Sequence, residues 1–327
     1  MTGLAHKVAG AYRQAGLGAA CTCLAYNALK KTRAFGLSDK LYARQLKWQL
    51  DAIRTICCET LDRYKAAVCN VESNHIDDGR KIYSIWLQGE NSAPPVVKSC
   101  LTKLRKLYGD RFVLLTENDV NSLPIDETVK KKFAAGLMSK NMYANIVRMF
   151  LLKQGAVWCD ATLFVESMPD EVFSAPYYSI HRVNNLDGKS GQKSVVVERK
   201  GQRETLWSTF FWSMCKNNIV ANFCYDMFCE YWSKKNDIFD YYIFDMIVRV
   251  GYDDVPALKM MIDTLPINNN GNVHKLNPLL HQDYDEAKMR ALREGSVLQV
   301  FKLAHKHFNQ SALSNPNSFF NRVVWQD

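Results

Sequence analysis

Residues 139–162 read SKNMYANIVRMFLLKQGAVWCDAT, and this stretch predicts a helix, a turn and a buried strand in succession. Ser139 is a favourable N-cap, because its hydroxyl can accept a backbone N–H that otherwise lacks a partner. Gly155 suits the left-handed turn with which many helices end. Ala156–Trp158 is apolar and too short for a helix, so it is typical of a buried strand. Asp160 therefore follows a strand's carboxyl end, the edge where ligands of open α/β sheets gather.

The predicted helix carries a polar face beside its apolar one. Asn141, Asn145 and Arg148 follow one another at i, i+4 and i+7, so they share one side of the helix. A polar side next to Asp160 favours a ligand there. Two plainer interpretations stay open, because Arg148 can form a structural ion pair and Asp160 can cap a turn.

The composition is that of a globular protein with a large core. The chain has 327 residues, 47% of them hydrophobic, which suits one enlarged α/β domain or one domain with appendages. Its ten cysteines include no C-x-x-C pair, so neither a zinc site nor a secreted disulfide framework is indicated. We expect a cytoplasmic protein. No apolar run is long enough to suggest a transmembrane helix.

Residues 1–75 form a basic head with helical patterning. The first 70 residues hold eleven Lys and Arg against four Asp and Glu, which places +7 of the net charge of +9 there. Such a segment suits the anionic inner face of the cell membrane, so peripheral membrane binding is one interpretation. A solvated helical face packed beside the main domain is another, because charged runs usually face water. Nucleic acid is the least favoured partner, and we expect none.

A βαβ unit opens the main domain, which we place at residues 76–327. Lys81–Leu87 and Phe112–Leu115 are typical of strands, and Val96–Tyr108 between them is typical of a helix. No G-x-G-x-x-G or Walker loop appears, so dinucleotide and ATP binding are not indicated. Further along, the predicted elements are a strand at Leu206–Trp212 and a helix at Ile238–Val250 closed by Gly251.

Two residues at the end of the first predicted strand are candidates for binding a nucleotide base. The Trp86 ring can stack on a base, although a core position suits it equally. Gln88 follows in the same loop. Parallel strands leave such loops at one edge of the sheet, so these side chains are expected on the same edge as Asp160.

Several further motifs fit one pattern when they are taken together. The matches are Ser139-Lys140, Asn145-Ile146-Val147-Arg148, Gly155, Trp158, Asp160-Ala161-Thr162, Ile85 to Asn91 with Pro94, and Glu230-Tyr231-Trp232 before Asp240-Tyr241. This set resembles the capsular polysaccharide synthesis glycosyltransferases, which are related to glycosyltransferase family 32. In that family a Ser-Asp-Ile-x-Arg helix runs into a Gly-Gly-x-Trp-x-Asp-Ala-Thr strand end, a version of the Asp-x-Asp motif. The likeness covers roughly residues 80–307, and the start at Ala11–Arg13 is similar to the family's membrane-proximal head.

The resemblance implies a GT-A fold, that is, an α/β Rossmann-like nucleotide-sugar transferase domain with a C-terminal helical part for the acceptor. It further implies transfer of a hexose from a UDP- or GDP-linked donor to a growing surface glycan or lipid-linked glycan, with retention of configuration. Asn145 and Arg148 would bind the donor sugar. Trp207 and Tyr241 are candidates for binding the acceptor. Asp245 is a candidate general base if the enzyme inverts, since a base must reach the acceptor hydroxyl.

The metal site implied by the resemblance is sparse in this sequence. Mn²⁺ or Mg²⁺ binds oxygen ligands, and here Asp160 and Thr162 would supply them together with the donor phosphates. Asp160 is the only acid in the motif. Lys302 and Lys306 can instead neutralise the diphosphate, so a divalent cation is one of two alternatives.

Four positions depart from the family pattern, and the mildest is Ala156 in place of the second glycine. Asn145 stands where the family has Asp, which changes sugar preference or weakens binding by roughly 1–3 kcal/mol, because an amide lacks a charged acceptor. Asp245 and Phe301 each stand where the family has His, and the loss at Phe301 would remove a metal or diphosphate contact. These departures favour an alternative function: a catalytically impaired relative that acts as a glycan- or membrane-binding scaffold.

Overall fold

A five-stranded mixed sheet lies at the centre of the molecule. The computed structural model describes residues 3–29, 35–68, 77–183, 196–199, 202–267, 269–306, 308 and 311–325. The strands stand in the order β2-β1-β3-β9-β5. Their bounds are β1 Lys81–Ile85, β2 Phe112–Leu115, β3 Ala156–Cys159, β5 Tyr177–Ser179 and β9 Phe211–Met214. This mixed α/β arrangement is compatible with the Rossmann-like domain predicted from the sequence.

The pairing of the strands decides which loops meet. Strand β1 pairs in parallel with both β2 and β3, which confirms the predicted βαβ unit, whereas β9 runs antiparallel to β3 and β5. Because β1 and β3 are parallel neighbours, their carboxyl ends lie at the same edge of the sheet. Trp86 follows β1 and Asp160 follows β3, so both residues stand at this edge.

The helix and strand predicted for residues 139–162 are confirmed. Helix α7 spans Lys140–Lys153, and the Ser139 hydroxyl accepts the Met142 N–H at 3.3 Å as its N-cap. Gly155 has φ of +87°, the left-handed conformation that the sequence indicated. A Cβ at Gly155 would lie 3.0 Å from the backbone N of Lys216, so this glycine also permits close packing. Strand β3 begins at the next residue.

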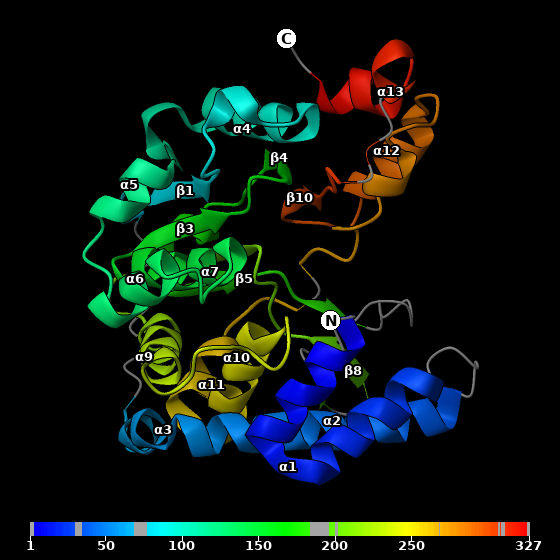
Figure 1. The fold of residues 1–327 in the computed structure, drawn as a ribbon. Coiled ribbons are helices and arrows are strands. Elements are labelled where there is room, and N and C mark those ends of the chain that lie inside the picture. The colour runs from blue at the N-terminus through cyan, green and yellow to red at the C-terminus, as the bar shows by residue number, and fades with distance from the viewer. Residues whose placement is uncertain are drawn as a thin grey trace.

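Helices cover the central sheet. In Figure 1, helix α4 lies above the strands, and α9, α10 and α11 lie below them. The bounds in this main part are α4 Pro95–Tyr108, α5 Glu117–Ser122, α6 Glu127–Ala134, α8 Glu171–Ser174, α9 Ile219–Lys234, α10 Ile243–Asp254 and α11 Pro256–Asp263. Residues of α4, α7, α9 and α10 share one hydrophobic core with the sheet.

The N-terminal residues are helical, as predicted. Helices α1, α2 and α3 span Gly3–Leu29, Phe35–Ile56 and Cys58–Lys65. Ile53 and Leu61 are buried in the same core as the sheet, so α2 and α3 pack as part of the main body. The boundary predicted at residues 75 and 76 falls within 69–76, outside the described residues. Across the described ranges, no helix combines the length and apolar character needed to cross a bilayer.

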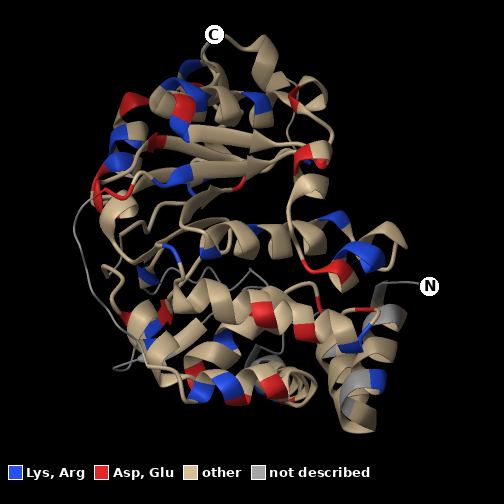
Figure 2. Ribbon diagram, turned by 90° about the vertical axis from the view of Figure 1, so that its left-hand side faces the viewer, with Lys and Arg blue, Asp and Glu red and all other residues tan. Residues whose placement is uncertain are grey.

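Acidic partners compensate part of the basic charge of the head. Arg54 Nε donates to Asp254 Oδ2 at 2.6 Å, and an Arg63 nitrogen lies 2.8 Å from Asp226 Oδ2. Both acids belong to helices of the main body. Figure 2 shows Lys and Arg positions interleaved with Asp and Glu positions along these helices. The contacts agree with a helical face packed beside the main domain, and binding to a membrane surface stays a prediction.

The C-terminal part contributes a second, smaller sheet beside the first. Strand β10 (Gln299–Lys302) pairs antiparallel with β4 (Leu163–Ser167), so the tail is joined to the chain that follows Asp160. The other elements described are strands β6 Arg182–Val183, β7 Val196–Arg199 and β8 Gln202–Thr205, helices α12 Glu286–Arg293 and α13 Ser311–Ser314, and short helical turns at Glu90–Ser92, Gly109–Arg111, Asn277–Leu279 and Phe320–Val324.

Two element predictions were wrong. The helix predicted to end at Gly251 runs through it to Asp254, because Gly251 is a packing position: a Cβ there would come within 2.6 Å of the Phe223 ring. The strand predicted at Leu206–Trp212 begins only at Phe211. The aromatic residues before Phe211 lie in a loop, and their side chains are buried in the core. Their apolar character therefore reflects burial and does not indicate a strand.

Candidate active site

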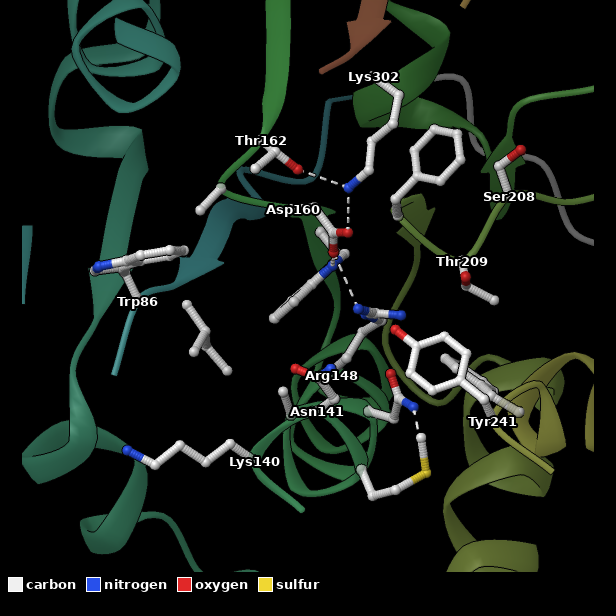
Figure 3. Close-up of a pocket in the computed structure, with 18 of the residues that line it drawn as sticks. Trp86, Lys140, Asn141, Arg148, Asp160, Thr162, Ser208, Thr209, Tyr241 and Lys302 are labelled. Carbon is white, nitrogen blue, oxygen red and sulfur yellow. Dashed lines mark hydrogen bonds and ion pairs between the residues drawn. The ribbon is translucent and has the colours of Figure 1, made fainter. Parts of the chain in front are cut away.

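A pocket of about 520 Å³ opens at the carboxyl edge of β1 and β3. Figure 3 shows side chains from several elements around it. All eleven site residues predicted from the sequence line this one pocket: Trp86, Gln88, Asn145, Arg148, Asp160, Thr162, Trp207, Tyr241, Asp245, Lys302 and Lys306. The fold therefore brings together residues that lie more than two hundred positions apart in the chain.

Asp160 is the centre of a hydrogen-bond network. Its Oδ1 accepts from an Arg148 nitrogen at 3.0 Å and from the Trp158 indole N–H at 2.8 Å. Its Oδ2 accepts from Lys302 Nζ at 2.6 Å. The cations Lys302 and Arg148 outweigh the effect of burial and lower the pKa of Asp160, so the side chain is a carboxylate.

Arg148 is held in place by aromatic rings. The guanidinium carbon lies 4.6 Å from the centre of the Trp158 ring and 5.5 Å from that of Phe244. The side chain is 8% exposed, and burial lowers the pKa of the guanidinium from its ordinary value. The buried Nε atom has no hydrogen-bond partner among the described residues. The interpretation of Arg148 as a structural ion pair is therefore confirmed by its contact with Asp160.

Lys302 lies between the two residues that we predicted as metal ligands. Its ammonium donates to Asp160 Oδ2 and also to the Thr162 hydroxyl, at 2.8 Å. Figure 3 shows the ammonium between these two oxygens. The backbone around it is also fixed, because the Leu303 N–H donates to the Thr162 carbonyl at 2.9 Å. A lysine distant in sequence is therefore an integral part of the Asp160 turn.

Trp86 and the basic tail form one side of the pocket. Trp86 is partly buried and meets the His305 ring edge-on, with ring centres 5.6 Å apart. Gln88 and Lys306 are exposed at the same side. Burial and the neighbouring cations Lys306 and Lys302 lower the pKa of His305, so this histidine is neutral at pH 7.

Asp245 and its neighbours form the other side of the pocket. The carboxylate accepts a hydrogen bond from the Trp207 indole N–H at 3.3 Å, and burial raises its pKa to about 7. Tyr241 is 59% exposed and lies beside Arg148 in Figure 3, across Asp160 from Trp86. Tyr241, predicted to bind the acceptor, thus lies apart from Trp86, predicted to stack on the nucleotide base.

The sequence did not single out every residue of the pocket. Lys140 and Asn141 line it from the first turn of α7, and Ser208 and Thr209 line it from the loop before β9. Asn141 had a signal, its helical spacing with Arg148. The loop residues had none, because their position depends on the antiparallel pairing of β9 with β3. The Ser208 hydroxyl is buried and lacks a hydrogen-bond partner among the described residues.

Of the positions that depart from the family pattern, Asn145 lies in the pocket and Phe301 does not. Asn145 lines the pocket beside Arg148, and its amide donates a weak contact to the Met142 sulfur at 3.9 Å. Phe301 is buried in a separate cluster with Val96 and Phe164, away from the pocket. Because successive side chains of a strand point to opposite faces, Lys302 faces the site and position 301 does not. The expectation that a histidine is lost from the site at Phe301 is therefore wrong.

The described residues do not fit a divalent cation well. No three His, Cys, Asp or Glu side chains gather as metal ligands in the described ranges. The predicted pair, Asp160 and Thr162, offers one carboxylate and one hydroxyl, and both already bind the Lys302 ammonium. A Mg²⁺ or Mn²⁺ ion here would have to displace the ammonium and take its remaining oxygen ligands from the donor phosphates and water.

Comparison with known proteins gave one finding. The family model described as capsular polysaccharide synthesis protein matches residues 31–323. This range includes every lining residue of the pocket and nearly the whole main body. No curated protein and no solved structure matches the chain.

Proposed function

The chain belongs to the capsular polysaccharide synthesis family, and from this premise we propose that it is a GT-A-type glycosyltransferase. It moves a hexose from a UDP- or GDP-linked donor to a growing capsular or other surface polysaccharide. The observation that carries the proposal is the pocket that joins Asp160, Arg148 and Lys302 at the carboxyl edge of the parallel strands. Ligands of open α/β sheets bind at this edge.

The charge of the pocket suits a diphosphate. Four basic side chains line it, Lys140, Arg148, Lys302 and Lys306, against the two acids Asp160 and Asp245. A nucleoside diphosphate gains negative charge as it leaves the sugar, and fixed cations stabilise that charge in a site shielded from water. The buried, unpaired donor of Arg148 also favours a polar ligand, because buried polar atoms normally have partners.

The two sides of the pocket divide the substrates between them. We assign the nucleotide base to Trp86 and Gln88, because an aromatic ring can stack on a base. Asn145 and Arg148 then bind hydroxyls of the donor sugar, next to Asp160. The acceptor enters past the exposed Tyr241 on the other side. Trp207 lines the same pocket but is only 1% exposed.

The transfer itself needs few groups from the protein. The bond between the anomeric carbon and the diphosphate oxygen breaks, and both electrons leave with that oxygen. The acceptor hydroxyl oxygen forms the new bond to the anomeric carbon. Under retention, which we favour, its proton passes to the leaving diphosphate; under inversion it passes to Asp245, whose raised pKa suits a general base near neutral pH.

A thermal-shift panel tests the proposal. UDP-, GDP- and CMP-sugars at millimolar concentration are added with and without Mn²⁺, and a ligand that binds only the folded state raises the melting temperature. We expect UDP- or GDP-sugars to do so and CMP-sugars not to. If no nucleotide stabilises the protein while a control transferase responds, the proposal fails. Donor hydrolysis that Asp160→Asn abolishes would separate an enzyme from a scaffold that only binds glycans.

A further inference from the structure

We propose that Lys302 supplies the positive charge that a divalent cation supplies in metal-dependent transferases, so that this pocket binds and uses its donor without a metal. The inference rests on the proposed transferase function and adds the cofactor requirement of the same site. It is carried by the position of one ammonium group. Asp160, Thr162 and Lys302 make up what we call the lysine turn.

The ammonium of the lysine turn occupies the space a metal would need. Lys302 Nζ lies 2.6 Å from Asp160 Oδ2 and 2.8 Å from the Thr162 hydroxyl. A Mg²⁺ or Ca²⁺ ion bound to the same oxygens would lie about 2.0–2.6 Å from them. The two cations cannot share this space. Metal binding would therefore require Lys302 to leave both partners.

The backbone of Lys302 is fixed in its strand, and one ring contact adds to the hydrogen bonds of its ammonium. The residue belongs to β10, where it stands opposite Leu163 of β4, and its N–H donates to the Val273 carbonyl at 2.7 Å. The backbone N–H of Leu303, the residue after Lys302, donates a hydrogen bond to the Thr162 carbonyl. The ammonium also lies 5.2 Å from the centre of the Phe210 ring, a cation–π contact. The backbone contacts fix where the side chain starts, and the ring contact joins the two hydrogen bonds that hold the ammonium itself.

The electrostatics of Asp160 point the same way. Its carboxylate already faces two cations, with an Arg148 nitrogen 3.0 Å from Oδ1 and Lys302 Nζ 2.6 Å from Oδ2. Asp160 thus serves to orient the ammonium, and the ammonium keeps its remaining donor capacity for a phosphate oxygen. During transfer the Lys302 ammonium compensates the electron pair that the diphosphate oxygen receives when its bond to the anomeric carbon breaks. No proton or electron needs to pass through the lysine.

The decisive measurement compares metal-free and metal-loaded protein. Wild-type protein is stripped with EDTA, and binding of UDP and GDP is measured by calorimetry in EDTA and again with Mn²⁺, alongside hydrolysis of UDP- and GDP-hexoses. We expect nucleotide affinity and hydrolysis to change by less than about threefold between the two conditions, which corresponds to less than about 0.7 kcal/mol. Mn²⁺ titrated alone should give no binding heat at the site.

Substitutions of Lys302 test whether its ammonium is the cation that binds the nucleotide. Lys302→Met keeps a long apolar stem without charge and should weaken nucleotide binding in EDTA by about tenfold or more. Lys302→Arg should retain part of the affinity. Lys275→Met is the matched control, because Lys275 is an exposed lysine on the same C-terminal segment, and it should bind like wild type.

The outcomes separate the two proposals. Nucleotide binding or hydrolysis that occurs only with Mn²⁺ or Mg²⁺ would overturn the role of Lys302 and leave the transferase function intact. Wild-type affinity in a folded Lys302→Met protein would overturn it as well. The absence of nucleotide binding under both conditions would instead overturn the transferase function on which the inference rests.

Discussion

Arg148 and Asp160 are joined by a hydrogen bond of 3.0 Å, although one lies on α7 and the other follows the strand that comes after this helix. The helix and the strand are connected by Gly155, so the contact depends on a reversal of the chain between them. The same carboxylate is held by Trp158 and by Lys302. The carboxylate that orients the two cations of the pocket thus also organises the structure around it.

Asp160→Asn should abolish donor hydrolysis while the protein stays folded. The amide can still accept from Trp158, but it no longer pairs with the two cations, and the loss of one such group costs about 10²–10³ in rate. Hydrolysis of UDP- and GDP-hexoses is the assay, with circular dichroism as the check on folding. Asp110→Asn, at an exposed position outside the pocket, should hydrolyse like wild type. Hydrolysis by Asp160→Asn at the wild-type rate would remove Asp160 from the site.

Arg148→Lys should destabilise the protein by roughly 1–3 kcal/mol, because lysine cannot stack its head on Trp158 and Phe244 as a planar guanidinium does. Urea unfolding measures the loss. Arg290→Lys offers the comparison: its exposed ion pair with Glu286 should change stability by less than about 0.5 kcal/mol. Equal effects at the two sites would contradict the role of the aromatic packing.

Asp245→Asn should change the pH dependence of stability. In the folded protein burial raises the pKa of Asp245 from 3.8 to about 7. The folded state therefore binds one more proton than the unfolded state between about pH 4 and pH 7, and its stability falls as pH rises through this window. Above it the contribution is constant. The asparagine variant should lack this contribution. The melting temperature of the variant minus that of wild type should therefore increase as the pH is raised from 4 to 8. Parallel profiles would show that Asp245 titrates normally.

Gly155→Ala should cost roughly 1–3 kcal/mol and disturb the approach of Arg148 to Asp160. The position has φ of +87°, and a Cβ would come within 3.0 Å of the Lys216 backbone. Gly79→Ala is the control for conformation alone, since Gly79 has φ of +72° and a Cβ added there would meet no atom within 4 Å. Thermal unfolding of both variants measures the difference. A larger loss at Gly79 would contradict the packing role of Gly155.

Trp86→Ala should weaken nucleotide binding by about 1–3 kcal/mol, and Trp86→Phe should recover much of it, because either aromatic ring can stack on a base. Calorimetry with UDP and GDP gives the affinities. Trp325→Ala is a distant control at a tryptophan outside the pocket. Unchanged affinity in Trp86→Ala would assign Trp86 to the core, the interpretation that the sequence left open.

The local signals in the sequence were enough to predict the elements that carry the site. An N-cap at Ser139, a left-handed glycine at Gly155 and a short apolar run before Asp160 each report a local backbone preference, and the structure has all three. The βαβ unit was equally readable, because strand, helix and strand follow one another without interruption. Local patterns failed at Gly251, where the glycine serves packing against Phe223 and does not end the helix.

The sequence by itself determined the helix α7, the strand β3 and the place of Asp160 at a sheet edge, because the preferences behind them act between near neighbours. Only the tertiary structure decided that Lys302 lies between Asp160 and Thr162, and that Phe301 points away from them. Both facts depend on the pairing and register of β10 with β4, which join residues about 140 positions apart in the chain. No local pattern records such a register, since it is set by the packing of the whole chain.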